Sequence, residues 1–333
     1  MGVNISDIVP REEIGFEKLR DKIVALDAFN VLYQFLASIR GADGTPLQDS
    51  QGRITSHLQG MFSRTLNLMG KGIKLVYVFD GVAPELKFKE RERRKGLKMD
   101  AAEKFEEASD ADDVELMSKF SSRMSRLTPE MVEEAKRLAL AMGLPIIEAP
   151  SEADGQISYM CKKGEVDYAA SMDYDCLLFG SPYLVRNLTL SQKRKVPGGK
   201  YVHTFLELVK LKDVLKELDV DQDGLIAMGI LVGTDFNVGG VHGIGPKKAL
   251  KLVREKGLDS IKEVENWEEI YKIFTELPYT DQYVLEWGKL DETKVKNILV
   301  AEHEFSEDRI SALLEKYKVE KDKNSQSALD SFF

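Results

Sequence analysis

A short apolar run that ends abruptly in an acid and a glycine most constrains how this chain can fold. Residues 74–81 read Lys-Leu-Val-Tyr-Val-Phe-Asp-Gly, and such β-branched and aromatic residues are typical of a fully buried strand of a parallel sheet. Asp80 then follows the strand at its carboxyl end, where open α/β sheets bind ligands. Because Asp-Gly is also a common turn, this strand alone is weak evidence of a site.

The same arrangement occurs twice more along the chain. The run 22–27 ends in Asp27, and the run 167–173 ends in Asp173, with Asp175 two residues later. Residues two apart on a strand point the same way, so Asp173 and Asp175 are predicted to face one pocket. Three strands that deliver carboxylates to one sheet edge predict a metal site. A phosphatase-type Asp-x-Asp nucleophile is a weaker interpretation, because no Ser/Thr and Lys pattern obviously completes it downstream.

Composition places the chain among ordinary globular proteins. Its 333 residues are 43% apolar and 31% charged, and no apolar stretch is long enough to span a bilayer. The N-terminus lacks an apolar secretory core, so we expect an intracellular protein. Cys161 and Cys176 have no Cys or His companions and are predicted to be reduced core residues. A net charge of −9 does not exclude a nucleic-acid partner, because an acidic metal site adds negative charge that bound metal neutralises.

Helix signals lie between the predicted strands. Apolar spacing predicts amphipathic helices at residues 29–39 and 56–69, and Thr128-Pro129-Glu130 is a strong helix start. After a further strand at 144–148, Ser151 is predicted to cap a helix that carries Glu152 and Asp154 in its first turn. Acids there are explained by the helix dipole alone, but their place beyond a strand end favours a role as ligands.

Residues 84–126 are dominated by charge, including the basic run from Lys87 to Lys95. A solvated helix with ion pairs four residues apart is the plain interpretation of such a run. Because the run directly follows the Asp80 strand, a helical insertion that guides a phosphate backbone toward the metals is favoured instead.

Two later segments carry further signals. Gly243-Ile244-Gly245-Pro246 followed by Lys247 and Lys248 resembles a helix-hairpin-helix turn that binds phosphates, although a plain tight turn is the alternative. Asp221 is predicted to be a helix cap and not a calcium ligand, because Ile230 stands where such a loop needs Glu. Residues 326–333 end in two phenylalanines that are predicted to dock on a partner.

Together these motifs resemble, in order and over essentially the whole chain, the structure-specific 5′ flap endonucleases. The resemblance rests on Asp27, the stretches 44–58 and 76–81, Pro150 to Asp154, Asp173-Tyr174-Asp175 and Gly233-Thr234-Asp235. The tail is similar to the sliding-clamp-binding box Q-x-x-L-x-x-F-F, matched by Gln326, Leu329, Phe332 and Phe333. Asp154 departs from the family pattern, which often has Glu there.

The resemblance implies a magnesium-dependent phosphodiester hydrolase with flap endonuclease and 5′ exonuclease activity. It implies two Mg²⁺ ions, replaceable by Mn²⁺, one held by Asp27, Asp80, Glu152 and Asp154 and the other by Asp173, Asp175 and Asp235. Lys87 and Arg94 would contact the scissile phosphate, Tyr33 would stack on a base, and Gly2 would lie near the DNA junction. The turn containing Gly243, Gly245, Lys247 and Lys248 would bind the downstream duplex with the help of K⁺.

The implied fold is α/β: a mixed, mostly parallel sheet flanked by helices, as in PIN-like 5′ nucleases. One nuclease domain (1–317) would comprise an N-terminal part (1–98), a helical arch (84–126) and an internal part (127–260) with a helical hairpin (225–256). A linker (318–325) and the clamp-binding tail (326–333) would follow.

The implied partners are branched DNA with a 5′ flap and the sliding clamp (PCNA), with no membrane and a monomeric enzyme. The implied location is the cytoplasm of an archaeal cell, or the nucleus of a eukaryotic one. Two other classes fit less well. A non-catalytic junction-binding protein would not need all seven acids. A single-strand RNase of the PIN type would need neither the arch, the hairpin nor the clamp box.

Overall fold

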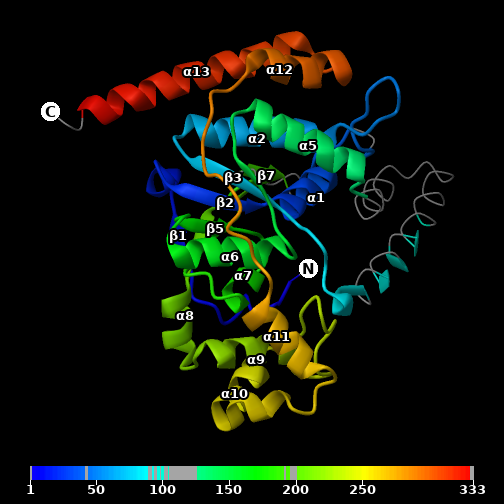
Figure 1. The fold of residues 1–333 in the computed structure, drawn as a ribbon, viewed down its shortest axis with the longest axis vertical. Coiled ribbons are helices and arrows are strands. Elements are labelled where there is room, and N and C mark those ends of the chain that lie inside the picture. Colours follow the sequence, from blue (N-terminus) through cyan, green and yellow to red (C-terminus); the bar gives the residue numbers. More distant parts are fainter. Residues whose placement is uncertain are drawn as a thin grey trace. The chain divides into compact units, whose positions relative to one another are not determined.

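A seven-stranded mixed sheet organises the fold (Figure 1). Its strands are β1 (Glu12–Ile14), β2 (Ile23–Asp27), β3 (Lys74–Phe79), β4 (Ile146–Glu148), β5 (Tyr168–Ala170), β6 (Tyr183–Arg186) and β9 (Leu206–Lys210). Their order in the sheet is β1-β9-β6-β5-β2-β3-β4. β5 is parallel to β2 and β6, whereas β9 is antiparallel to β6 and β1. The predicted α/β fold with a mixed central sheet is confirmed.

The computed structural model describes residues 2–41, 44–88, 92–93, 96–97, 99–100, 104, 126–190, 193–195 and 201–330. The chain forms two units, each built from three segments. The first unit comprises Met1–Asp27, Val78–Arg91 and Glu148–Tyr283, and the second comprises Ala28–Tyr77, Glu92–Ile147 and Val284–Phe333. The boundaries predicted for the nuclease domain are not decided by this division and stay a prediction.

The first unit contains most of the sheet and a group of short helices. The helices are α6 (Ala153–Lys163), α7 (Asp175–Leu178), α8 (Leu211–Leu218), α9 (Gln222–Val232), α10 (Pro246–Lys256) and α11 (Trp267–Glu276). A two-stranded hairpin joins β7 (Lys193–Lys195) to β8 (Tyr201–His203). Helix α9 packs against α10 and α11 (Figure 1). Asp221 caps α9 as predicted, because its Oδ1 accepts a hydrogen bond from the Gly224 amide at 2.8 Å.

The second unit is mainly helical. Its helices are α1 (Ala28–Ser38), α2 (Ser56–Gly70), α5 (Pro129–Ala141), α12 (Glu292–Lys296), a π-helical turn (Asn297–Glu302) and α13 (Glu307–Asp330). α1 and α2 confirm the two amphipathic helices predicted from apolar spacing. Thr128 caps α5 through a hydrogen bond from the Met131 amide at 3.3 Å. Helix α2 packs against α1, α5 and α13 (Figure 1).

Three local expectations are wrong. Helix α6 begins at Ala153, and Ser151 does not cap it, because its hydroxyl donates to the Val82 carbonyl at 2.9 Å. Strand β5 ends at Ala170, so the alternation of a strand does not reach Asp173. Residues 318–325, expected to be a linker, continue α13. They include three Lys and one Glu, which are good helix formers, and ion pairs such as Lys318–Glu315 support the helix.

The arch expected at residues 84–126 lies largely outside the described residues, which include a 3₁₀ turn at Glu85–Lys87. In the described part of the chain, no helix is both long enough and apolar enough to cross a membrane.

Candidate metal centre

All seven predicted carboxylates belong to the first unit. Six of them lie at strand ends or at the starts of helices, and the seventh follows a helix. Asp27 ends β2, Asp80 follows β3, Glu152 and Asp154 stand at the start of α6, Asp173 lies between β5 and α7, Asp175 begins α7, and Asp235 follows α9. We call these seven residues the acidic cluster.

The ionisation of these acids shows that they share one electrostatic environment. Burial raises the pKa of Asp154 well above its usual range, and the charges of Asp27, Asp175 and Asp173 raise it further. Burial also raises the pKa of Asp175 to about 7, with contributions from Asp173 and Asp235.

Glu152 belongs to the same environment. Burial raises its pKa, Lys87 opposes that shift, and Asp80 and Asp235 add to it. Each of the seven predicted acids therefore acts on at least one other, and the fold brings together residues that are up to 208 positions apart in the sequence (27 to 235).

Hydrogen bonds fix three of the carboxylates. Asp80 Oδ1 accepts from the backbone amide of Ala153 at 2.7 Å, so a strand-end acid satisfies the amino end of α6. Asp175 Oδ1 accepts from the amide of Val3 at 2.7 Å. The thiol of Cys176 donates to Asp154 Oδ1, with 2.9 Å between Sγ and oxygen.

Lys87 contributes a positive charge within the acidic cluster. Its ammonium donates to Glu152 Oε2 and lies 3.7 Å from Asp235 Oδ2, and its side chain is only 15% exposed. Burial lowers the pKa of Lys87, but ion pairing with Glu152, Asp80 and Asp235 outweighs burial, so the pKa is raised. Lys87 acts as a counter-ion for part of the acidic cluster.

The donor chemistry of the cluster fits hard divalent cations, which prefer carboxylate oxygens. In the described part of the chain, however, no three Asp, Glu, His or Cys side chains are arranged so that they could hold a metal ion in their present positions. Lys87 contacts Glu152 and lies 3.7 Å from Asp235, where a cation would otherwise be held. The gathering of seven buried or half-buried carboxyl groups is the observation that fits a metal.

Comparison with known proteins identifies the family. Residues 5–101 match the XPG N-terminal domain and residues 143–235 match the XPG I-region. Flap endonuclease 1 of Thermococcus onnurineus is 48% identical over 339 residues, covering 100% of this chain and 99% of that protein. The structure of flap endonuclease-1 from Methanococcus jannaschii has a TM-score of 0.78 and 43% identity, covering 97% of this chain and 100% of that one. The chain belongs to the flap endonuclease family.

A more distant structure has the same fold. The catalytic core of Rad2 in complex with DNA substrate has a TM-score of 0.68 at 22% identity, and the match covers 92% of this chain and 96% of that chain. At that identity the likeness concerns the fold alone.

The structure describes some of the residues predicted to bind DNA, and others lie outside its described part. A Cβ atom built on Gly2 would lie 2.5 Å from Asp175 Oδ2, so the N-terminal segment passes close to the acidic cluster, and a side chain at position 2 would require the Asp175 carboxylate to shift. Tyr33, on α1 of the second unit, is 38% exposed. Arg94 lies outside the described residues.

The predicted helix-hairpin-helix turn leads into α10. Gly243 has a φ of 77°, which favours glycine, and Lys248 Nζ donates to its carbonyl at 2.9 Å. Gly245 precedes Pro246 at the start of α10, and Lys247 is exposed beside it. Of the clamp box, the backbone of Gln326 and Leu329 belongs to α13, whereas Phe332 and Phe333 lie outside the described residues. The DNA-binding and clamp-binding assignments stay predictions.

Sequence reasoning missed two residues that contact the acidic cluster or its loops. Cys176 was predicted to be a plain core residue, and only its position beside Asp175 hinted at the contact with Asp154. Arg186, at the end of β6, donates to the Met172 carbonyl and the Tyr174 hydroxyl on either side of Asp173. No motif in the sequence marks this arginine.

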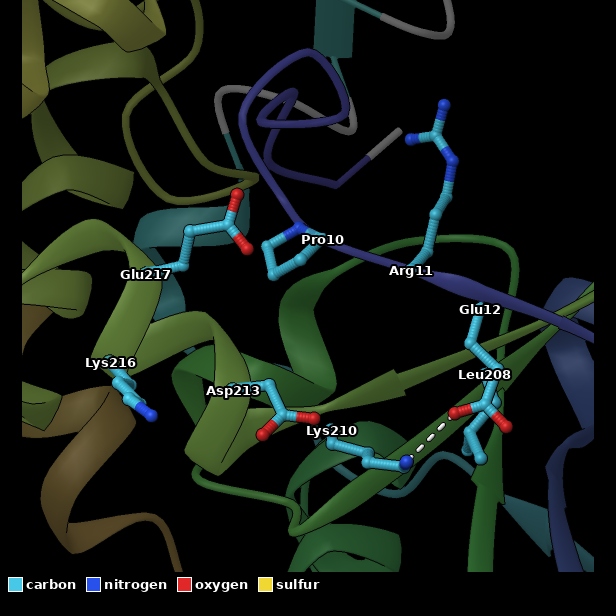
Figure 2. A pocket seen from close by; sticks show the side chains of 8 residues that line it. All are labelled: Pro10, Arg11, Glu12, Leu208, Lys210, Asp213, Lys216 and Glu217. Atoms are coloured by element: carbon cyan, nitrogen blue, oxygen red, sulfur yellow. Dashed lines mark ion pairs between the residues drawn. The ribbon is translucent and has the colours of Figure 1, made fainter.

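A separate hollow of about 490 Å³ lies in the first unit beside β1, β9 and α8 (Figure 2). It is lined by Pro10, Arg11, Glu12, Leu208, Lys210, Asp213, Lys216 and Glu217. Its three basic and three acidic side chains balance in charge, and Lys210 pairs with Glu12 at 2.7 Å. This hollow therefore lacks the charge excess that distinguishes the acidic cluster.

Proposed function

We propose that this chain is a structure-specific 5′ flap endonuclease with accompanying 5′–3′ exonuclease activity. It hydrolyses a phosphodiester of branched DNA near the junction of single strand and duplex, in Okazaki-fragment maturation and DNA repair. The observation that carries the proposal is the gathering of seven buried or half-buried carboxylates in the acidic cluster, where Lys87 contacts Glu152 and Asp235. Membership of the flap endonuclease family supports the choice of substrate.

The cofactor proposed from the donor set is Mg²⁺, two ions per site, with Mn²⁺ as a substitute. One ion would be held by Asp27, Asp80, Glu152 and Asp154, and the other by Asp173, Asp175 and Asp235. When bound, such ions activate water and stabilise the leaving oxygen of an in-line phosphodiester displacement.

Side chains of this chain would supply the remaining chemistry. Lys87 neutralises Glu152 and Asp235 in the free protein, and it is free to contact the scissile phosphate once cations take over that task. Arg94 would contact the same phosphate. Cys176 is not a suitable nucleophile, because burial and the neighbouring Asp154 raise the pKa of its thiol well above the usual value and keep it protonated.

DNA would be positioned by groups outside the acidic cluster. The exposed Lys247 and Lys248 stand at the amino end of α10, where backbone amides and positive charge favour phosphate. A K⁺ ion in the turn at Gly243 and Gly245 would assist this contact with the downstream duplex. Tyr33 would stack on a base near the cut, and Gly2 would keep the N-terminal segment close to the junction.

The C-terminal residues would recruit the enzyme, as a monomer, to a sliding clamp. Gln326, Leu329, Phe332 and Phe333 match the clamp-binding box in full. Two aromatic anchors often provide most of the binding energy of such an interface.

The decisive experiment compares cleavage of end-labelled 5′-flap, bubble and single-stranded substrates in Mg²⁺, in Mn²⁺ and in EDTA. We expect cleavage near the flap junction in either metal and none in EDTA. Preferential cleavage of single-stranded RNA would favour the PIN-type RNase instead, and tight junction binding without cleavage would favour a scaffold protein. Adding the cognate clamp should stimulate the wild type but not the Phe332→Ala, Phe333→Ala double variant.

A further inference from the structure

The loop that carries Asp173 and Asp175 has little backbone support of its own. Strand β5 ends at Ala170 and helix α7 begins only at Asp175. Between them, the amide of Asp173 is bonded to the hydroxyl of Ser171 at 3.3 Å. Two carboxylates that repel each other therefore sit on a turn that needs support from elsewhere.

Arg186 provides such support from the neighbouring strand. Ala170 of β5 pairs with Val185 of β6, so Arg186 lies beside the point where β5 ends. Its Nε and Nη2 both donate to the Met172 carbonyl, at 3.1 and 3.0 Å. Its Nη1 donates to the Tyr174 hydroxyl at 2.7 Å, and its guanidinium lies 4.2 Å from the centre of the Tyr174 ring.

Arg186 is itself fixed in place. Its Nη1 also donates to Glu207 Oε2 at 2.7 Å, and Glu207 lies opposite it in the β6–β9 pair. Glu207 Oε1 is in turn 3.4 Å from Arg11 Nε. The side chains of Arg186 and Glu207 are only 16% and 21% exposed, so this pair is partly shielded from solvent.

The contacts alternate along the loop. Arg186 holds positions 172 and 174, and the two acids of the metal site occupy positions 173 and 175. The four bonds to Met172, Tyr174 and Glu207 use four of the five N–H donors of a guanidinium. This arrangement suits a side chain that shapes the loop better than one that binds a DNA phosphate.

We propose that Arg186 is a positioning residue of the metal site. It holds the 172–175 loop so that Asp173 and Asp175 remain directed at the cations despite their mutual repulsion. The inference rests on the proposed function, because it assumes that these acids bind Mg²⁺. Partners of metal ligands commonly change metal affinity by 10- to 100-fold when they are removed.

The test is Arg186→Met, with Lys210→Met as the matched control. Lys210 lies on β9, opposite Tyr183 of β6, and pairs with Glu12 without touching the loop. Mg²⁺ binding to the free protein is measured by calorimetry, and melting is measured in EDTA and in Mg²⁺. We expect Arg186→Met to bind Mg²⁺ about tenfold more weakly or worse. Lys210→Met should bind it as the wild type does.

A second variant separates positioning from folding and from DNA contact. Arg186→Lys keeps the charge but cannot make the fork of bonds to Met172 and Tyr174, so it should also weaken Mg²⁺ binding. If Arg186→Met does not fold, Arg186→Lys decides the question. If the folded variant binds Mg²⁺ as tightly as the wild type does, the inference is wrong. This holds even if the variant binds flap DNA more weakly in Ca²⁺, because such a loss would indicate a DNA contact and not positioning of the metal ligands. If the wild type itself neither binds Mg²⁺ nor cleaves flaps, the proposed function fails instead.

Discussion

Each unit of this protein contains a buried cluster of titratable groups, and the two clusters differ in their balance of charge. In the second unit, Glu134 lies between two buried histidines, 3.2 Å from His57 Nε2 and 3.2 Å from His303 Nε2. Asp49 lies 3.5 Å from His303 Nδ1 and pairs with Arg53 at 2.7 Å. Every acid there faces a basic side chain.

In the acidic cluster of the first unit, the acids act on one another. Its seven carboxylates are accompanied by Lys87, and the pKa of Asp154 and Asp175 is raised by burial and by neighbouring acids. We call the second cluster balanced and the acidic cluster unbalanced; a cation that binds the native state would stabilise the unbalanced cluster further. The comparison indicates that an excess of like charges distinguishes a ligand-binding site from a structural cluster. Burial and the number of ionisable groups distinguish the two less well.

The largest expected effect comes from removing one charge of the acidic cluster. Asp80→Asn should lower single-turnover cleavage by several orders of magnitude, because correctly placed metals need the carboxylate. The asparagine oxygen can still accept from the Ala153 amide, so α6 keeps its contact. Less repulsion should leave melting in EDTA unchanged or raised, and the stabilisation by Mg²⁺ should shrink.

Asp213→Asn, at an exposed position of α8, is the control and should change stability by no more than about 0.5 kcal/mol. If Asp80→Asn melts clearly below the wild type in EDTA, Asp80 is chiefly a structural contact of α6. The proposed contrast between the two clusters would then be wrong at this position.

Removing the counter-ion should have the opposite effect on stability. Lys87→Met removes the ammonium group that contacts Glu152 and Asp235, so the metal-free protein should lose about 3 kcal/mol in denaturant titrations in EDTA. Mg²⁺ should recover most of that loss. Cleavage should fall about 10²- to 10³-fold, because a charge directed at the scissile phosphate is gone. Equal stability of variant and wild type in EDTA would show that Lys87 does not balance the acids.

The balanced cluster should respond differently. Glu134→Gln removes the carboxylate between His57 and His303 and should cost about 2 kcal/mol of stability, to the same extent in EDTA and in Mg²⁺. Cleavage per folded molecule should stay within about twofold of the wild type. The adjacent Glu133→Gln, at a side chain that is 66% exposed, is the control. A Mg²⁺-dependent loss in Glu134→Gln would contradict the separation of the two clusters.

Sequence alone could predict what depends on local pattern. The β3 strand, the Thr128 cap of α5 and the Asp221 cap of α9 follow from apolar runs and capping residues, and they were confirmed. Six of the acids could be found because each ends or follows a strand or stands at the start of a helix, whereas Asp235 was found through the resemblance to the flap endonucleases. The structure places them in one electrostatic environment, and their role as metal ligands stays a prediction.

Contacts between distant segments could not be predicted. Ser151 has the residue type of a helix cap. Asp80 instead accepts a hydrogen bond at the start of α6, although it lies far earlier in the sequence. It can do so because residues 81–82 pair with residues 150–151. Arg186 and Lys87 carry no local signal of their partners. The end of α13 was misjudged because a charged stretch with Val319 as its one apolar residue suits either a linker or an exposed helix.

The smallest expected effect tests a neutral donor in the unbalanced cluster. Cys176 and Cys161 are both buried and free, but only Cys176 donates to an acid in the described structure. Truncating either to alanine should cost about 1 kcal/mol for the lost packing. Cys176→Ala should cost about 1 kcal/mol more in EDTA, because Asp154 loses its hydrogen-bond donor. Mg²⁺ should reduce the difference in stability between the two alanine variants, because a bound cation then stabilises Asp154. Cys176→Ser keeps a hydrogen-bond donor, so its stability should lie between those of the two alanine variants. Denaturant titrations of the three variants, with and without Mg²⁺, measure these differences. Equal stability of Cys176→Ala and Cys161→Ala in EDTA would mean that the thiol only fills space, and that the carboxylates alone define the unbalanced cluster.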